Sequence, residues 1–414
     1  MSDASATDRP SADRSASDRP ARVKKKYVPA VTPRLRIVLI AVFALFALLS
    51  ANSVYLAGIT FLEYTTGKGL QDQFYQWMVL LHLALGLLLL LPFMAFAYFH
   101  LVATRKRKNR IAVRVGYSLL AVCLVLLVSG LLLFRIDGLP KLQSVQMRTL
   151  VYWAHVISPL GVVWLYIIHR LAGPPIKWRV GLSYAAVVAV VVGALVVLKL
   201  QDPRDLYAVG SPKSKDYFEP SLVRTRGGNF IPERSLMNDQ YCLDCHQDVH
   251  ADHYTSAHHF SSFNNPAYLT SVDETRRVVF ERHGTVQASR FCAGCHDPVP
   301  FFSGKFDDPN FDMIKDPTAS AGITCIVCHS ITSVGDEEGH VRGNADYSIE
   351  EPIHYPFAYS ENPFLKWVNH QLIKAKPAFH KQMFLKPVHK STEFCGTCHK
   401  VHLPGILNDY KEWL

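Results

Sequence analysis

The stretch "GITCIVCHS", from Gly322 to Ser330, places two cysteines three residues apart and a histidine directly after them. The same C-x-x-C-H pattern occurs four times in this 414-residue chain. The residues of the four copies are Cys242, Cys245 and His246; Cys292, Cys295 and His296; Cys325, Cys328 and His329; and Cys395, Cys398 and His399. Only one of the nine cysteines, Cys123, lies outside these copies. Such regular repetition indicates one chemistry used four times.

C-x-x-C-H is the signature of covalent attachment of c-type haem. The two thiols bond to the vinyl groups of the porphyrin and the adjacent histidine binds the iron, so all three groups must meet one macrocycle. Zinc sites also use paired cysteines, but they do not require a histidine after every pair. A thioredoxin-like redox disulfide is plausible for one such pair and not for four. The sequence therefore predicts four covalently attached c-type haems.

A six-coordinate haem needs a second axial ligand on the other face of the iron. Eleven further histidines follow residue 241, more than four haems require. For any one of them the alternative is a surface histidine or a hydrogen-bonding one. The sequence contexts favour four of these residues as distal ligands: His258, His354, His380 and His389.

The apolar residues are concentrated in the first half of the chain. Each of five runs approaches or exceeds the roughly 20 residues that cross a bilayer as a helix. The runs are near residues 36–61, 75–101, 113–134, 151–171 and 181–200. Five such runs in succession are not expected of a soluble domain, so they predict a five-helix transmembrane bundle.

The predicted organisation is therefore mainly α, in four segments. Residues 1–30 alternate Ser, Ala, Asp, Arg and Pro and predict a disordered tail. The transmembrane bundle occupies 31–200, and 201–240 is expected to be a polar linker. The remaining segment, 241–414, is expected to be an extracytoplasmic tetrahaem domain with short helices and long loops, built around something other than an ordinary apolar core.

The net charge of +10 fits a membrane better than a nucleic acid, because the basic residues cluster beside the apolar runs. The flank at 22–36 and the connection at 105–114 are the most basic segments around the helices. Cytoplasmic segments carry this excess, so the N-terminus is expected in the cytoplasm. Five crossings then place the haem domain in the periplasm. The chain is therefore expected to be a multi-pass protein of a bacterial cytoplasmic membrane. It is expected to contact lipid and no nucleic acid.

Four histidines lie inside the apolar runs, where ionisable residues are rare and usually functional. They are His82 and His100 on the second run, and His155 and His169 on the fourth. Alternate helices run parallel, so His82 and His155 lie near the outer surface and the other two near the inner surface. Each pair is expected to hold one b-type haem. The alternative is that these histidines form hydrogen bonds between helices.

The spacing of the four histidines is not fully regular. One pair is separated by 18 residues along its helix and the other by 14, a mismatch of about 6 Å at 1.5 Å per residue. Pro92 and Pro159 lie within these two intervals, and proline kinks a helix. Gly116 and Gly130 on the third run are expected to leave space for two flat macrocycles.

Two resemblances follow from these residues. Residues 30–200, through their four histidines, resemble the haem-bearing half of cytochrome b from quinol-oxidising cytochrome bc complexes. Residues 241–402, through motifs such as "EFCGTCHKVHLP", resemble the multihaem cytochrome c family of small tetrahaem carriers and multihaem reductases. The resemblances imply a membrane-bound respiratory protein that passes electrons between the quinone pool, two b haems and four c haems.

The same resemblances imply quinone or quinol and other periplasmic electron-transfer proteins as partners, within a larger complex. Three alternatives stay open. The chain can be a c-type reductase or oxidase acting on a small nitrogen or sulfur compound at a five-coordinate haem. It can run the current in reverse, from an external donor to quinone. It can also be a haem-wired anchor subunit. No catalytic residue is singled out by the sequence.

Overall fold

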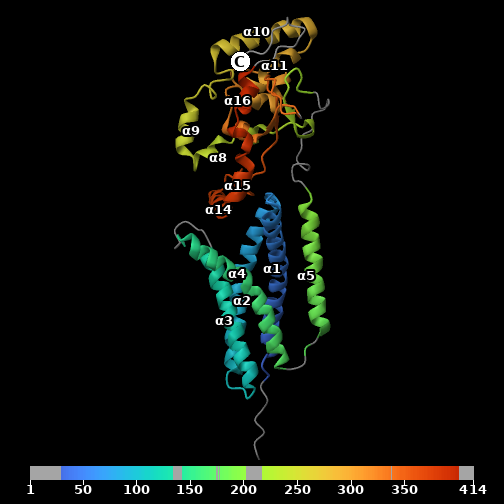
Figure 1. Cartoon of the computed structure of the whole chain (residues 1–414), viewed down its shortest axis with the longest axis vertical. Coiled ribbons are helices and arrows are strands. Elements are labelled where there is room, and N and C mark those ends of the chain that lie inside the picture. Colours follow the sequence, from blue (N-terminus) through green and yellow to red (C-terminus); the bar gives the residue numbers. More distant parts are fainter. Residues whose placement is uncertain are drawn as a thin grey trace, which may run out of the picture.

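The computed structural model describes residues 29–133, 142–173, 176, 178–201, 217–336 and 338–400. Five long helices form the first half, and short helices with a small sheet form the second, which we call the head (residues 217–400; Figure 1). Nearly all of the predicted tail lies outside the described residues, as does 202–216 of the predicted linker. The mainly helical fold predicted from the sequence is confirmed.

Each of the five predicted runs forms one helix that is long and apolar enough to cross a membrane. The helices are α1 (Pro33–Thr66), α2 (Gln73–Thr104), α3 (Arg110–Leu132), α4 (Val145–Leu171) and α5 (Trp178–Lys199). Large apolar side chains point outward along them, for example Leu91 and Val190, which are 77% and 73% exposed. A helix that is apolar on all sides is typical of a lipid environment.

The helices pack in two close pairs, α1 with α2 and α3 with α4, and α5 packs on α1. The backbones of α2 and α4 make little direct contact. Hydrogen bonds fix the turn between α1 and α2, where Gly67 ends α1 with a left-handed φ of 67°. Asp72 caps α2 through the Tyr75 amide at 2.8 Å and also pairs with Lys199 of α5 at 2.6 Å. The ends of α1, α2 and α5 that face the head are thereby tied together (Figure 1).

The head contains many short elements joined by long connections. Its helices are α7 (Glu233–Leu236), α8 (Asp239–Leu243), α9 (Gln247–Tyr254), α10 (Pro266–His283), α11 (Arg290–His296), α12 (Pro298–Phe302), α13 (Cys325–Ser330), α14 (Pro363–Ala375), α15 (Pro377–Phe384) and α16 (Thr392–His399). Four 3-10 turns accompany them: η1 (Arg226–Gly228), η2 (Gln287–Ser289), η3 (Lys305–Asp307) and η4 (Pro387–Lys390).

A three-stranded sheet of order β1-β3-β2 lies in the head. Strand β1 (Arg224–Thr225) runs parallel to β3 (Tyr347–Ile349), with Arg224 opposite Ser348. Strand β2 (Ile331–Val334) is antiparallel to β3 and pairs Val334 with Tyr347. Because β2 begins directly after α13, the sheet holds the third C-x-x-C-H motif in place.

The head has an apolar core of its own, which differs from the expectation that haem would replace one. Phe218, Phe301, Phe302 and Phe306 are completely or almost completely buried and belong to one cluster. Phe218 comes from residues 217–240, which the sequence assigned to a linker. The folded head therefore extends back at least to Tyr217, because Phe218 of this polar segment packs against Phe301 and Phe302.

A buried ion pair supports this core beside the second motif. The Arg290 Nε atom lies 2.7 Å from Asp307 Oδ1, and these side chains are only 11% and 16% exposed. The Arg290 guanidinium also lies 4.4 Å from the ring of Tyr217. Arg290 opens α11, so the pair fixes the start of the helix that carries Cys292, Cys295 and His296.

Candidate haem sites

Short helices present the haem-attachment motifs. The second, third and fourth motifs end on α11, α13 and α16, and the first runs from α8 to His246 at the start of α9. Residues at i, i+3 and i+4 of a helix share one face. In the second, third and fourth motifs, the helical conformation therefore turns both thiols and the imidazole to one side, as attachment to one macrocycle requires.

Local hydrogen bonds fix two of these helices. Thr324 caps α13 by accepting from the Val327 amide at 3.1 Å, and Ser391 caps α16 by accepting from the Phe394 amide at 3.2 Å. Thr324 directly precedes the third motif, and Ser391 lies four residues before the first cysteine of the fourth motif. The orientation of the motif is thus determined by the chain immediately before it.

Two motif histidines are oriented by backbone carbonyls. The Nδ1 atom of His296 lies 2.8 Å from Ser261 O, and Nδ1 of His329 lies 2.6 Å from Phe384 O. A carbonyl oxygen can only accept, so Nδ1 carries the proton and Nε2 keeps a free lone pair. Histidine ligands of metals commonly have this arrangement, because the second hydrogen bond sets the tautomer and the ring orientation.

The attachment cysteines meet in two pairs that join different motifs. The thiol of Cys242 lies beside that of Cys325, and this contact raises the pKa of Cys242 and lowers the pKa of Cys325. Cys295 Sγ lies 4.0 Å from Thr397 O, beside the thiol of Cys398, and this contact raises the pKa of Cys295 and lowers the pKa of Cys398. The first motif is therefore adjacent to the third, and the second is adjacent to the fourth.

Three of the four predicted distal histidines face a motif histidine. The ring centroids of His246 and His380 are 6.3 Å apart, with planes 12° apart. His399 and His258 are separated by 6.1 Å. His329 and His389 are closer, at 5.1 Å, and Nε2 of His389 also lies 3.3 Å from Ile331 O.

The fourth predicted distal ligand, His354, does not face a motif histidine. Its ring packs against Tyr241, Tyr359 and Phe384. Neither ring nitrogen has a hydrogen-bond partner among the described residues, and burial lowers the pKa of His354 to about 4. The neutral imidazole of His354 is therefore enclosed by aromatic rings. The sequence alone did not predict this environment.

His296 differs from the other motif histidines. Its only ring contact within the described part of the chain is with Tyr268, stacked at 4.4 Å. Tyr268 donates a hydrogen bond to Asp297, which is fully buried and also accepts from Ser262. Burial raises the pKa of Asp297 to about 7, although these hydrogen bonds act in the opposite direction. His402, another of the eleven histidines that follow residue 241, lies outside the described residues.

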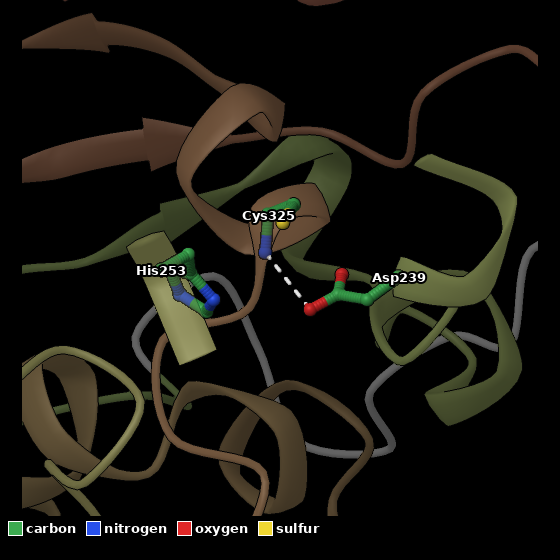
Figure 2. A group of neighbouring side chains, drawn as sticks. All are labelled: Asp239, His253 and Cys325. Atoms are coloured by element: carbon green, nitrogen blue, oxygen red, sulfur yellow. Dashed lines mark hydrogen bonds between the residues drawn. The ribbon is translucent and has the colours of Figure 1, made fainter. Parts of the chain in front are cut away.

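Two further groups of possible metal ligands lie in the described part of the head, and one of them, Asp336, Glu338 and His340, is mostly exposed. Figure 2 shows Asp239, His253 and Cys325, whose ligand atoms are all within 4.8 Å of one another. The Cys325 amide donates to Asp239 Oδ2 at 3.3 Å, and His253 Nε2 lies 2.8 Å from Ile323 O. Mixed ligands of this kind suit zinc. Cys325 is, however, the first cysteine of the third motif, so haem attachment would consume its thiol.

The four membrane histidines meet as two pairs between α2 and α4. His82 and His155 have ring centroids 6.0 Å apart, and His100 and His169 are 6.3 Å apart. The ring planes are 79° apart in both pairs. Both pairs form despite the unequal spacing along the helices, with Pro92 inside α2 and Pro159 inside α4.

Every membrane histidine also contacts an oxygen through Nδ1. For His82 this oxygen is Asn52 Oδ1 on α1, at 3.2 Å, and for His100 it is Ala30 O, also at 3.2 Å. For His155 and His169 the oxygens belong to α3, namely Leu126 O at 3.2 Å and Ala112 O at 3.1 Å. All four Nε2 atoms are left available to a metal. Asn52 was not predicted as a site residue, although a polar residue within an apolar run was a readable signal.

The glycines of α3 lie against the imidazoles. A Cβ atom at Gly130 would be 3.0 Å from His155 Cε1, and one at Gly116 would be 3.3 Å from His169 Cε1. Both distances are shorter than ordinary van der Waals contact. Gly116 and Gly130 therefore leave space for the histidine rings of α4.

Together, the C-x-x-C-H helices and the apolar helices define a c-type cytochrome domain carried by a multi-pass membrane part. Comparison with known proteins agrees for the head: residues 241–330 match the family described as cytochrome c554 and c-prime. This match includes the first three motifs. No curated protein and no solved structure matches the chain. The chain thus contains a haem-binding domain of an electron-transfer type.

Proposed function

We propose that this protein is a membrane-bound respiratory electron-transfer protein with two b haems in the bundle and four c haems in the head. The two histidine pairs between α2 and α4 carry the proposal. Bound haem supplies one-electron chemistry, and the protein sets its ligands and environment. The bundle would hold one haem near each membrane surface, and together they would form a path for electrons across the bilayer.

The separation of the imidazoles supports this proposal. A metal–imidazole bond is about 2 Å long, so two imidazoles on opposite faces of one metal have ring centroids about 6 Å apart. The observed separations are 6.0 Å and 6.3 Å. Hydrogen bonds between helices, the competing interpretation, account for the Nδ1 atoms, since His82 bonds to α1 and His155 bonds to α3. They do not account for the approach of the two rings across the space between the helix pairs, which a metal held by the Nε2 atoms would explain.

The same geometry supports six-coordinate haems at the first and fourth motifs. His246 and His380 are 6.3 Å apart, and His399 and His258 are 6.1 Å apart. The third pair, His329 and His389, is about 1 Å closer than the same geometry requires. His389 would therefore move outward from its contact with Ile331 when iron lies between the rings.

The partner on the membrane side would be quinol, a lipid-soluble donor suited to haems within a bilayer. Electrons would pass from quinol through the b haems to the c haems and on to a periplasmic electron-transfer protein. This direction follows from the resemblance to quinol-oxidising cytochrome b. The basic connections of the bundle support placing the head in the periplasm.

A pyridine haemochrome spectrum of the purified protein, with the haem-to-protein ratio, tests the proposal. The expected result is four covalent c haems and two extractable b haems per chain, with reduction of all six by a soluble quinol. Four c haems with no b haem would overturn the proposal. The chain would then be a tetrahaem head on a haem-free anchor.

A second function is favoured by His296. It alone among the motif histidines faces no other histidine in the described part of the chain. A haem attached to Cys292 and Cys295 would then keep one iron position open for a small nitrogen or sulfur compound. Binding of carbon monoxide by the reduced protein tests this function, because six-coordinate bis-histidine haems resist it.

A further inference from the structure

The head contacts the membrane helices through α14 and α15, which lie between the bundle and the rest of the head (Figure 1). Lys376, at the start of α15, donates to the Tyr75 hydroxyl of α2 at 3.1 Å and lies 5.3 Å from the centre of its ring. Gln382 on α15 donates to Gly69 O at 3.0 Å. One short helix of the head is thus fixed to the outer end of α2.

An apolar contact reinforces these polar ones. Tyr355, Leu372 and Phe379 form a buried cluster, against which Val79 and Leu80 of α2 pack. We call these five residues the junction cluster. Phe379 is completely buried. Nearby, the rings of Trp77 and Phe357 meet edge to face at 5.2 Å. The interface is therefore closely packed where the head meets the membrane part.

Candidate haem ligands flank the junction cluster on both sides. His82, of the outer membrane pair, follows Leu80 by two residues. His380, which faces His246, directly follows Phe379. By contrast, His399 lies at the end of α16, and α10 and α11 lie at the end of the head farthest from the bundle (Figure 1).

We propose that electrons cross between the membrane part and the head at the junction cluster, and that the haem held by His246 and His380 is the first c haem on the route. Electron tunnelling falls steeply with distance and is faster through packed atoms than across gaps, which favours the c haem nearest His82. This inference rests on the proposed function, because it assumes a haem between His82 and His155.

The pairing of thiols extends the route. The first motif adjoins the third, because α8 packs on α13 and Cys242 lies beside Cys325. The second adjoins the fourth, because Cys295 Sγ lies 4.0 Å from Thr397 O. Electrons that arrive at the first motif would pass to the adjoining third motif and then to the second pair. The second motif lies on α11, at the far end of the head.

The test places a methionine ligand at one haem and follows quinol-driven reduction by stopped-flow spectroscopy. Methionine in place of histidine raises a haem's reduction potential, so the haem becomes an electron trap with its own ferric absorption band. In His380→Met, the trap lies on the route, and reduction of the other three c haems should slow at least about tenfold. A rise of about 59 mV in the reduction potential of the trapping haem corresponds to a tenfold change for a one-electron couple. In the matched variant His258→Met, the first and third haems should keep their rates.

A second pair of variants tests the contact without touching a ligand. Lys376→Gln removes the charge that faces Tyr75, whereas Lys381→Gln changes an exposed lysine on the same helix. Only Lys376→Gln should slow reduction of the c haems, with the b haems reduced at the original rate, and only it should increase hydrogen exchange in α15.

The outcomes separate the two proposals. If quinol fails to reduce the haems of the unaltered protein, the proposed function is overturned and this inference with it. If quinol reduces them but His380→Met leaves the other three c haems at the original rate, or Lys376→Gln behaves like Lys381→Gln, only the junction route is overturned.

Discussion

The imidazole rings of His82 and His155 lie 6.0 Å apart with planes 79° apart, although they belong to helices whose backbones scarcely touch. His82 is supported from α1 by Asn52, and His155 is supported from α3 by Leu126 O. Each helix pair therefore orients one ring toward the other pair. This division of support is what a ligand held between the pairs needs, since neither ring is positioned by its partner.

Loss of a single membrane histidine should remove a single b haem. His82→Ala should lower the b-haem content from two to one per chain by removing the outer site, and His169→Ala should do the same at the inner site. The c-haem content should stay at four. Cys123→Ala on α3 is the control and should change neither ratio in a pyridine haemochrome assay. A full complement of b haem in both histidine variants would contradict the assignment.

A methyl group at Gly130 should disturb the outer pair. The new Cβ atom would lie 3.0 Å from His155 Cε1, and overpacking of this kind typically costs about 1–3 kcal/mol. We expect Gly130→Ala to lower the melting temperature of the b-haem absorption and to alter the low-spin EPR signal of the outer haem. Gly86→Ala is matched, because its Cβ meets nothing within 4 Å. Equal effects of both changes would refute a specific role for Gly130.

His354 should be dispensable for haem ligation. Its buried ring nitrogens have no hydrogen-bond partner among the described residues, and leaving a polar group in that state costs roughly 1–3 kcal/mol. His354→Phe should therefore raise the free energy of unfolding and leave the number of low-spin haems unchanged by EPR. His389→Phe should convert one haem to high spin. A new high-spin signal in His354→Phe would instead identify His354 as a ligand.

Carbon monoxide should bind one c haem of the reduced protein. We expect this haem to be the one beside His296, because the other motif histidines face a second histidine. Replacing both Cys292 and Cys295 by alanine should abolish binding, and the same change at Cys395 and Cys398 should preserve it. Binding that survives loss of the second motif would place the open iron elsewhere.

The buried pair of Arg290 and Asp307 should contribute strongly to stability. Removing one partner of a buried ion pair leaves an uncompensated charge and costs about 3–5 kcal/mol. Arg290→Met should lower the free energy of unfolding by that amount in urea titrations of the haem-loaded protein. Arg277→Met breaks an exposed pair with Glu281, in which the side chains are 58% and 62% exposed, and should cost less than about 1 kcal/mol.

The sequence predicted the features that depend on local pattern. Continuous apolar runs specified α1 to α5, because length and composition alone decide whether a helix can span a bilayer. Motif spacing predicted the attachment residues, and the rarity of histidine in apolar helices predicted His82, His100, His155 and His169 as ligands. The structure brings these four together in the pairing expected from their depth.

Features that depend on distant contacts were not readable. His258 lies 141 residues before His399, and no local pattern links the two rings. Phe218 occurs in a polar segment that reads as a linker, yet its partners Phe301 and Phe302 lie more than 80 residues further along the chain. His354 shares the aromatic context of a ligand but is enclosed by Tyr241 and Phe384 instead.

The thiol contact of Cys242 with Cys325, and that of Cys295 with Cys398, has a consequence for biogenesis. In an oxidising compartment, adjacent thiols form disulfides. A chain that folded before maturation would therefore cross-link different motifs and lose the sulfur atoms that the thioethers require. In the periplasmic location that we propose for the head, haem would therefore have to be attached while the head is still open, or a thiol reductant would have to act first. During assembly of the holoprotein, disulfide formation would thus compete with haem attachment for the same thiols.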